Sequence, residues 1–137
     1  MILDVAAPLA GGVLGGLYLA FDLAVLPALR RVPVGAPDDP ATTMRAINVA
    51  IVRPAFLVLL LGAPALAVAA AVVGPTPATV AAAALQAAGL VVTLAVNVPL
   101  NTALEHGGPW EGFVGPWARA HRVRTAAALL GAVLAAV

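Results

Sequence analysis

The sequence has no cysteine, lysine or serine, and only 9% of its residues are charged. Without cysteine the chain forms no disulfide, no thiolate metal site and no cysteine nucleophile. The lack of serine excludes a serine nucleophile as well. The formal net charge is +1, and nucleic-acid binding requires a much larger basic surface. The function classes that remain depend on few polar groups, so the position of each one matters.

Most residues in the sequence are apolar. Hydrophobic residues make up 63% of the 137 residues, whereas soluble domains have about 45–50% apolar and about 25% charged residues. A chain of this composition could not cover its apolar side chains in water, and a lipid bilayer is the solvent that suits it. The composition therefore predicts an integral membrane protein.

Four apolar runs are long enough for a helix to cross a bilayer, which requires roughly 20 residues. We expect an all-α fold, with residues 1–137 forming one membrane domain built as a four-helix transmembrane bundle. The predicted spans are 5–29, 54–73, 77–104 and 118–137. Helical spacing also extends the second run back to Pro40, with Asp39 as N-cap. A helix over 40–73 would be about 50 Å long, so we expect its first part to protrude or lie at the interface, with kinks at Pro54 or Pro64.

The arginines predict the orientation. They fall between the first and second runs and at the start of the fourth run, and the short connection between the second and third runs has none. The positive-inside rule then places both longer loops in the cytoplasm and both termini outside. We expect a bacterial inner membrane. The stretch "EHGGPWEGFVGPW" is rich in glycine, proline and aromatics, and we expect a loop there whose aromatic residues lie in the interfacial belt.

Placing a polar side chain in the bilayer costs free energy, so each polar residue within an apolar run needs an explanation. With the orientation above, nearly all of them fall in the cytoplasmic half. We predict that they line a polar pocket open toward the cytoplasm, with Asp22 paired to Arg124 or Arg53 because a lone buried carboxylate would protonate. The alternative is that the polar groups only bond helices together. The pocket residues that we predict are Asp22, Asn97, Asn101, His121 and Arg124.

Two stretches, "NVPLNTAL" and "PWEGFVGPWARAHRVRTAAALL", together with "VLPAL" and "MRAIN", resemble the anthrone oxygenase-like family of small membrane proteins. The resemblance covers nearly the whole chain. It implies a four-helix membrane bundle and oxidation of anthrones to anthraquinones by dioxygen without a recognised cofactor. One departure is Ala120-His121, where many relatives have Trp-Asn. The positions that the resemblance implicates are Asn97, Pro99, Asn101, Trp117, His121 and Arg124.

The resulting hypothesis is a membrane oxygenase whose partners are dioxygen and a lipophilic anthrone- or quinol-like compound. His121 or Asp22 would be the catalytic base, and Asn97, Asn101 and Arg124 would bind the developing enolate oxygen. Further substrate-binding residues would be Trp117, Tyr18 and Asn48. Two alternatives stay open. One is a non-enzymatic binder, transporter or assembly protein, and the other is a metal-dependent oxidase using Glu105, His106, Glu111 and His121. The sequence leaves homo-oligomerisation undecided.

Overall fold

The computed structural model describes residues 2–137, which form helices joined by short loops and contain no strand. The predicted all-α fold is confirmed. The elements are α1 (Ile2–Ala20), η1 (Phe21–Val25), α2 (Leu26–Leu29), α3 (Pro40–Ile51), α4 (Pro54–Val73), α5 (Pro77–Val92), η2 (Thr93–Asn97), α6 (Val98–Glu105) and α7 (Trp110–Ala135). The two η elements are π-helical turns, and they join α1 to α2 and α5 to α6 into two long helices.

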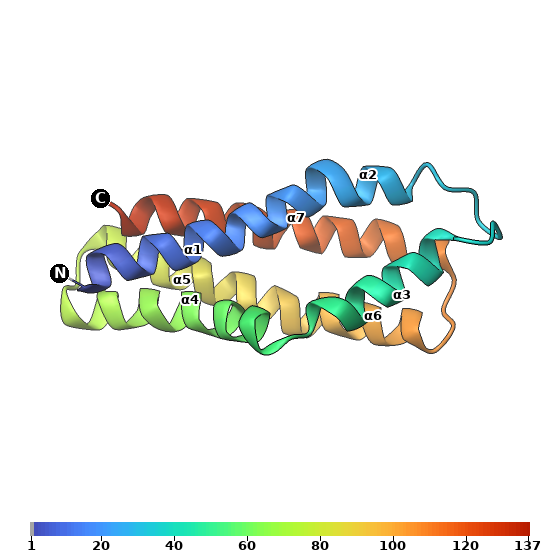
Figure 1. Ribbon diagram of the computed structural model, residues 1–137. Coiled ribbons are helices and arrows are strands. Elements are labelled where there is room, and N and C mark those ends of the chain that lie inside the picture. Colours follow the sequence, from blue (N-terminus) through green and yellow to red (C-terminus); the bar gives the residue numbers. More distant parts are fainter. Residues whose placement is uncertain (1) are drawn as a thin grey trace.

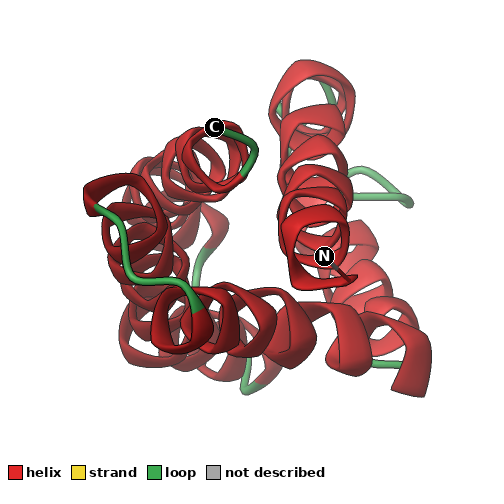
Figure 2. Cartoon of the chain, turned by 90° about the vertical axis from the view of Figure 1, so that its left-hand side faces the viewer, coloured by secondary structure: helices red, strands yellow, loops and turns green. Residues whose placement is uncertain are grey.

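The long helices run side by side and make an elongated molecule (Figure 1). Both α4 and α7 pack against α1 and α5. Both termini lie at one end, and the two longer loops lie at the other (Figure 1). Viewed from the end with the termini, the helices surround a common interior rather than forming a single layer (Figure 2).

Three helical segments are long and apolar enough to cross a membrane. They are Ile2–Leu29, Pro54–Val73 and Pro77–Glu105. These segments are consistent with an integral membrane protein. The fourth predicted span corresponds to α7, which is long enough at 26 residues but contains three arginines. Length and composition alone therefore do not place α7 across the membrane.

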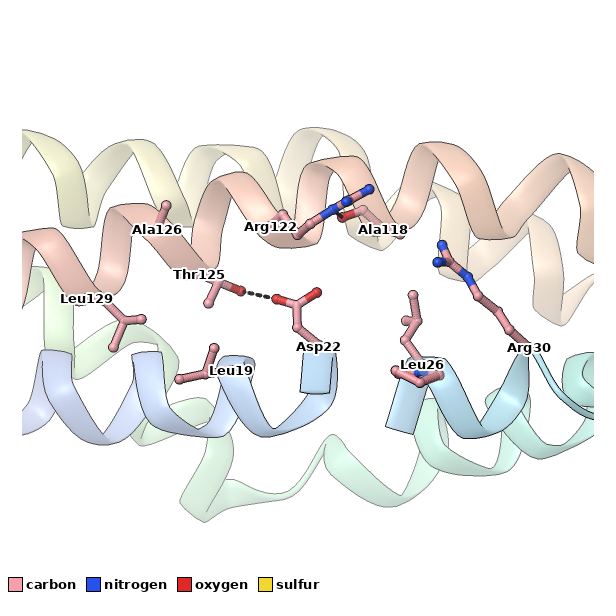
Figure 3. A pocket seen from close by; sticks show the side chains of 10 residues that line it. Leu19, Asp22, Leu26, Arg30, Ala118, Arg122, Thr125, Ala126 and Leu129 are labelled. Atoms are coloured by element: carbon pink, nitrogen blue, oxygen red, sulfur yellow. Dashed lines mark hydrogen bonds between the residues drawn. The ribbon is translucent and has the colours of Figure 1, made fainter. Parts of the chain in front are cut away.

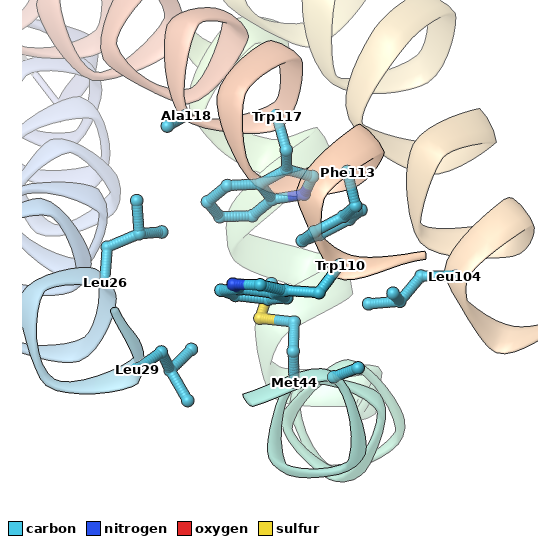
Figure 4. Packing of buried hydrophobic residues seen from close by; sticks show 9 residues of the cluster. Leu26, Leu29, Met44, Leu104, Trp110, Phe113, Trp117 and Ala118 are labelled. Carbon is cyan, nitrogen blue, oxygen red and sulfur yellow. The ribbon is translucent and has the colours of Figure 1, made fainter. Parts of the chain in front are cut away.

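The prediction of an interfacial loop before residue 118 was wrong in part. Helix α7 already begins at Trp110 and continues through Pro116. The aromatic side chains of Trp110, Phe113 and Trp117 recur at helical spacing and are buried against Met44 and other apolar residues (Figure 4). Their burial favours the helix strongly enough to tolerate an internal proline. These rings are thus part of the core instead of an exposed aromatic belt.

The helical extension from residue 40 is a separate helix, α3. Asp39 caps it as predicted, because its carboxylate accepts a hydrogen bond from the Thr42 N–H at 2.7 Å. That bond also lowers the pKa of the exposed Asp39 carboxyl below its usual range. The helix ends at Ile51, and Val52 and Arg53 are not helical. The ring of Pro54 disfavours α geometry in Arg53, the residue before it. Pro54 therefore breaks the helix, while α4 runs on through Pro64.

Both π-helical turns end two residues before a proline, Pro27 in one helix and Pro99 in the other. Proline has no N–H to donate, and its ring clashes with the carbonyl four residues earlier. A wider turn relieves that clash, and Leu26 and Val98 accordingly donate to carbonyls five residues back. Such turns are frequent at functional sites.

Glycine allows α1 to approach α7 closely. A Cβ on Gly15 would lie 2.7 Å from Cδ2 and 3.2 Å from the backbone nitrogen of Leu129, whereas a Cβ on Gly16 would meet nothing within 4 Å. The face of α1 that carries Gly15 therefore packs against α7, whereas Gly16 is not part of a helix contact. Close packing of small residues is the main source of helix association in lipid.

Candidate functional site

A cavity of about 310 Å³ lies between α1, α3, α4, α7 and the segment around η2. This volume is near the lower end of small-molecule sites in proteins. Seven of the eight site residues predicted from the sequence line it: Tyr18, Asn48, Asn97, Asn101, Trp117, His121 and Arg124. The structure thus brings together side chains from four helices that are far apart in the sequence.

The eighth residue, Asp22, lies elsewhere. It lines a separate groove between the α1–α2 helix and α7, with Arg30 and Arg122 nearby (Figure 3). Its carboxylate accepts a hydrogen bond from the Thr125 hydroxyl at 2.9 Å. Within residues 2–137 it makes no ion pair with Arg124 or Arg53, although we predicted one from the sequence. The Asp22 side chain is only partly buried, with 16% of it exposed.

His121 lies between this groove and the cavity. Its Nε2 donates to the carbonyl oxygen of Tyr18 at 2.9 Å, since a carbonyl can only accept. Oδ2 of Asp22 lies 3.6 Å from the same nitrogen. The other ring nitrogen, Nδ1, accepts from Nε and Nη2 of Arg124 at 3.0 and 2.8 Å. These contacts fix a neutral imidazole with the proton on Nε2.

The guanidinium of Arg124 is buried, with 8% of the residue exposed. Besides His121, it donates to the Thr93 hydroxyl at 3.2 Å and lies 4.3 Å from the centre of the Tyr18 ring. No carboxylate lies within 4 Å of it in the described part of the chain. A buried cation without an anionic partner is costly. This cation lines the cavity, so it would be stabilised by a ligand with an electron-rich oxygen.

Trp117 connects the remaining polar residues. Its indole Nε1 donates to Asn101 Oδ1 at 2.7 Å, and its backbone oxygen accepts from Asn97 Nδ2 at 3.3 Å. Its ring stacks on the imidazole of His121, with centroids 4.6 Å apart and planes 14° apart. The indole also belongs to the apolar cluster with Trp110 (Figure 4). One wall of the cavity is thus a rigid aromatic stack.

The cavity does not open as predicted. Met44 and Trp117, both in the buried cluster, cover it on the side of the longer loops. Every lining residue that is exposed on the surface is apolar. These residues are Leu17, Val52, Leu57, Leu94 and Val98. The mouth of the cavity therefore faces sideways, through surfaces that suit lipid better than water.

The site residues predicted from the sequence left out several residues that belong to the site. Phe21 and Phe56 line the cavity, and Thr93 holds Arg124. The signals that could have pointed to this region were Pro27 and Pro99, since each places a π-helical turn just before it. Asn97 and Thr93 are the two ends of one of these turns.

Comparison with protein-family models, with curated proteins and with solved structures found no match. The resemblance to the anthrone oxygenase-like family therefore stays a prediction. No group of three or more potential ligands among His, Cys, Asp and Glu gathers within residues 2–137. The four residues of the metal-site alternative are thus not clustered in the structure.

Proposed function

We propose that this chain is an integral membrane protein that binds a lipophilic, planar aromatic compound in the cavity and oxidises it with dioxygen. The observation that carries the proposal is the combination of an apolar, sideways mouth with a buried, unpaired guanidinium behind it. An apolar molecule dissolved in the bilayer meets the mouth directly, and its oxygen atom can reach Arg124.

The proposal includes a four-helix transmembrane arrangement in which α7 is the fourth span. Of the three arginines of α7, Arg124 is buried inside the protein. Arg119 and Arg122 are exposed and precede it on the helix, and their long side chains can extend toward the interface on the loop side. We place the longer loops in the cytoplasm, both termini outside, and the protein in a bacterial inner membrane. The ground is that the short connection between α4 and α5 has no arginine, whereas Arg30 and Arg31 lie beside one of the longer loops. Homo-oligomers are compatible with this arrangement.

For an anthrone the chemistry balances without a cofactor. A base takes a proton from the benzylic carbon, and the resulting enolate passes one electron to dioxygen. The two radicals combine at that carbon to a peroxide anion, which takes the proton back from the base. The resulting hydroperoxide loses water to give the anthraquinone. One anthrone and one dioxygen thus become one quinone and one water. The enolate oxygen is the atom that Arg124 would stabilise, because charge develops there in the transition state.

Of the two candidate bases, only His121 lines the cavity. Its Nδ1 is occupied by Arg124, so proton transfer requires Arg124 to turn toward the substrate oxygen and leave Nδ1 free. The Tyr18 carbonyl and the Asp22 carboxylate on the opposite side of the ring would then stabilise the imidazolium. Asp22 is therefore a positioning residue in this scheme, and His121 is the catalytic base.

The test uses purified protein in lipid nanodiscs with anthrone under oxygen, recording oxygen consumption and quinone absorbance together. We expect one dioxygen consumed per quinone formed, at a rate well above that of empty nanodiscs. A rate equal to the spontaneous oxidation would rule out the oxygenase. Gln86→Leu is a suitable control, since Gln86 is buried on α5, bonds Ala128 and does not line the cavity.

One observation favours a second candidate, a non-enzymatic binder of the same compounds. In the structure Nδ1 of His121 has no free lone pair, because Arg124 occupies it. If Arg124 stays in place when ligand binds, no base is available. Saturable binding of anthrone without oxygen consumption would identify this function.

A further inference from the structure

The hydrogen bonding of Asn97 indicates which ligands the cavity recognises. The residue is 1% exposed, and its Nδ2 donates to the backbone oxygen of Trp117. Since that oxygen can only accept, the orientation of the Asn97 amide is fixed by chemistry. Its Oδ1 is therefore an acceptor, and it has no hydrogen-bond partner within residues 2–137.

Asn97 lines the same cavity as Arg124. Asn97 lies one helical turn after Thr93, and Thr93 accepts from the Arg124 guanidinium. Asn48, which lines the same cavity from α3, has a buried Nδ2 that is also unpartnered within the described residues. The cavity thus has one acceptor without a donor, together with donors at Asn48 and Arg124.

We propose that Asn97 Oδ1 selects ligands with a hydroxyl group, so that the cavity takes hydroxylated aryl ketones or quinones in preference to unsubstituted ones. The hydroxyl donates to Asn97, and the ring oxygen accepts from Arg124 or Asn48. A buried acceptor left without a donor costs more than a typical hydrogen bond contributes. A ligand with a methyl ether at the same ring position leaves Asn97 Oδ1 without a hydrogen-bond donor. The choice of an aromatic ligand rests on the proposed function, but recognition of the hydroxyl does not require oxidation.

The experiment measures affinity for three probes: 2-hydroxyanthraquinone, 2-methoxyanthraquinone and anthraquinone. The chain has two tryptophans, and Trp117 lines the cavity. In a Trp110→Phe background, quenching of Trp117 therefore reports binding in lipid nanodiscs. The pH is set where the absorbance of the hydroxylated probe shows that it is protonated. We expect the hydroxyl compound to bind about tenfold more tightly than the methoxy compound.

Asn97→Leu removes the acceptor, and we expect it to abolish the tenfold ratio. Gln86→Leu makes the same kind of change on the same long helix outside the cavity and should preserve the ratio. A ratio near one in the Trp110→Phe protein overturns the inference, whether or not Asn97→Leu folds, and so does a ratio that survives Asn97→Leu.

Binding and oxidation separate the two proposals. Selectivity for the hydroxyl without oxygen consumption supports this inference and removes the oxygenase. Oxidation of anthrone with equal affinities for the three quinones supports the oxygenase and removes this inference. Failure of all three probes to bind overturns the inference.

Discussion

Arg124 and His121 form a hydrogen-bonded pair in which two donors of the guanidinium share one acceptor, Nδ1 of the imidazole. Both side chains are on α7, three residues apart, and both are buried. The imidazole has only one lone pair at Nδ1, so the second donor adds little. A ligand oxygen can therefore take one of the two donors at low cost, whereas proton transfer to Nδ1 requires both donors to leave it.

The first prediction concerns Arg124→Lys. Lysine keeps the charge, but its three donors are on one nitrogen and cannot reproduce the planar fork with which Arg124 reaches His121, Thr93 and a ligand. We expect kcat/KM for anthrone oxidation to fall about a hundredfold, as for loss of one donor to a developing oxyanion. Oxygen consumption in nanodiscs measures it, and Arg122→Lys in the neighbouring groove is the control. Unchanged kinetics in Arg124→Lys would show that the guanidinium does not touch the reacting oxygen.

The second prediction separates the roles of Asp22 and His121. Asp22→Asn keeps an oxygen to accept from Thr125 but removes the charge near His121 Nε2. Because Asp22 does not line the cavity, we expect the Kd of the ligand to stay the same, while kcat falls about tenfold or more. Steady-state kinetics and Trp117 quenching give the two values. A raised Kd with unchanged kcat would instead indicate that Asp22 shapes the binding site.

The fold was predictable to the extent that local rules decide it. Asp39 and Thr76 act as N-caps because capping depends on a few neighbouring atoms. The start of α7 was not predictable in this way. Pro116 and the surrounding glycines indicate a loop locally, and burial of Trp110 with residues distant in sequence overrides them.

The candidate site was predictable in membership but not in geometry. We predicted one pocket because the polar residues lie at a similar depth in the apolar runs, and Asn97, His121 and Arg124 do line one cavity. Depth could not show that Asp22 belongs to a different groove, because the rotation of a helix about its axis shifts at a π-helical turn. Counting by three and four residues assumes an uninterrupted α-helix, and Asp22 lies within such a turn.

The third prediction tests that turn at Pro99. Pro99→Ala restores an N–H and removes the ring that forces the wide turn at η2. If η2 tightens to α geometry, Asn97 rotates by about 100° relative to the rest of the helix. We expect equal or higher thermal stability together with weaker binding of 2-hydroxyanthraquinone. Pro8→Ala, in a helix segment without a π turn, should leave binding unchanged. Full affinity in Pro99→Ala would show that the turn is not needed for the site.

The fourth prediction tests the packing that holds α1 against α7. Gly15→Val places a branched side chain where even a Cβ would crowd the side chain and backbone of Leu129, so we expect a loss of about 1–3 kcal/mol in stability. Gly16→Val adds the same atoms one residue later, in open space. Both substitutions change helix propensity alike, so the difference between them isolates the helix contact. Thermal unfolding in detergent, followed by circular dichroism, gives that difference. Equal melting temperatures for Gly15→Val and Gly16→Val would show that the close contact at Gly15 does not stabilise the protein. That contact would then not be what holds Tyr18 against His121.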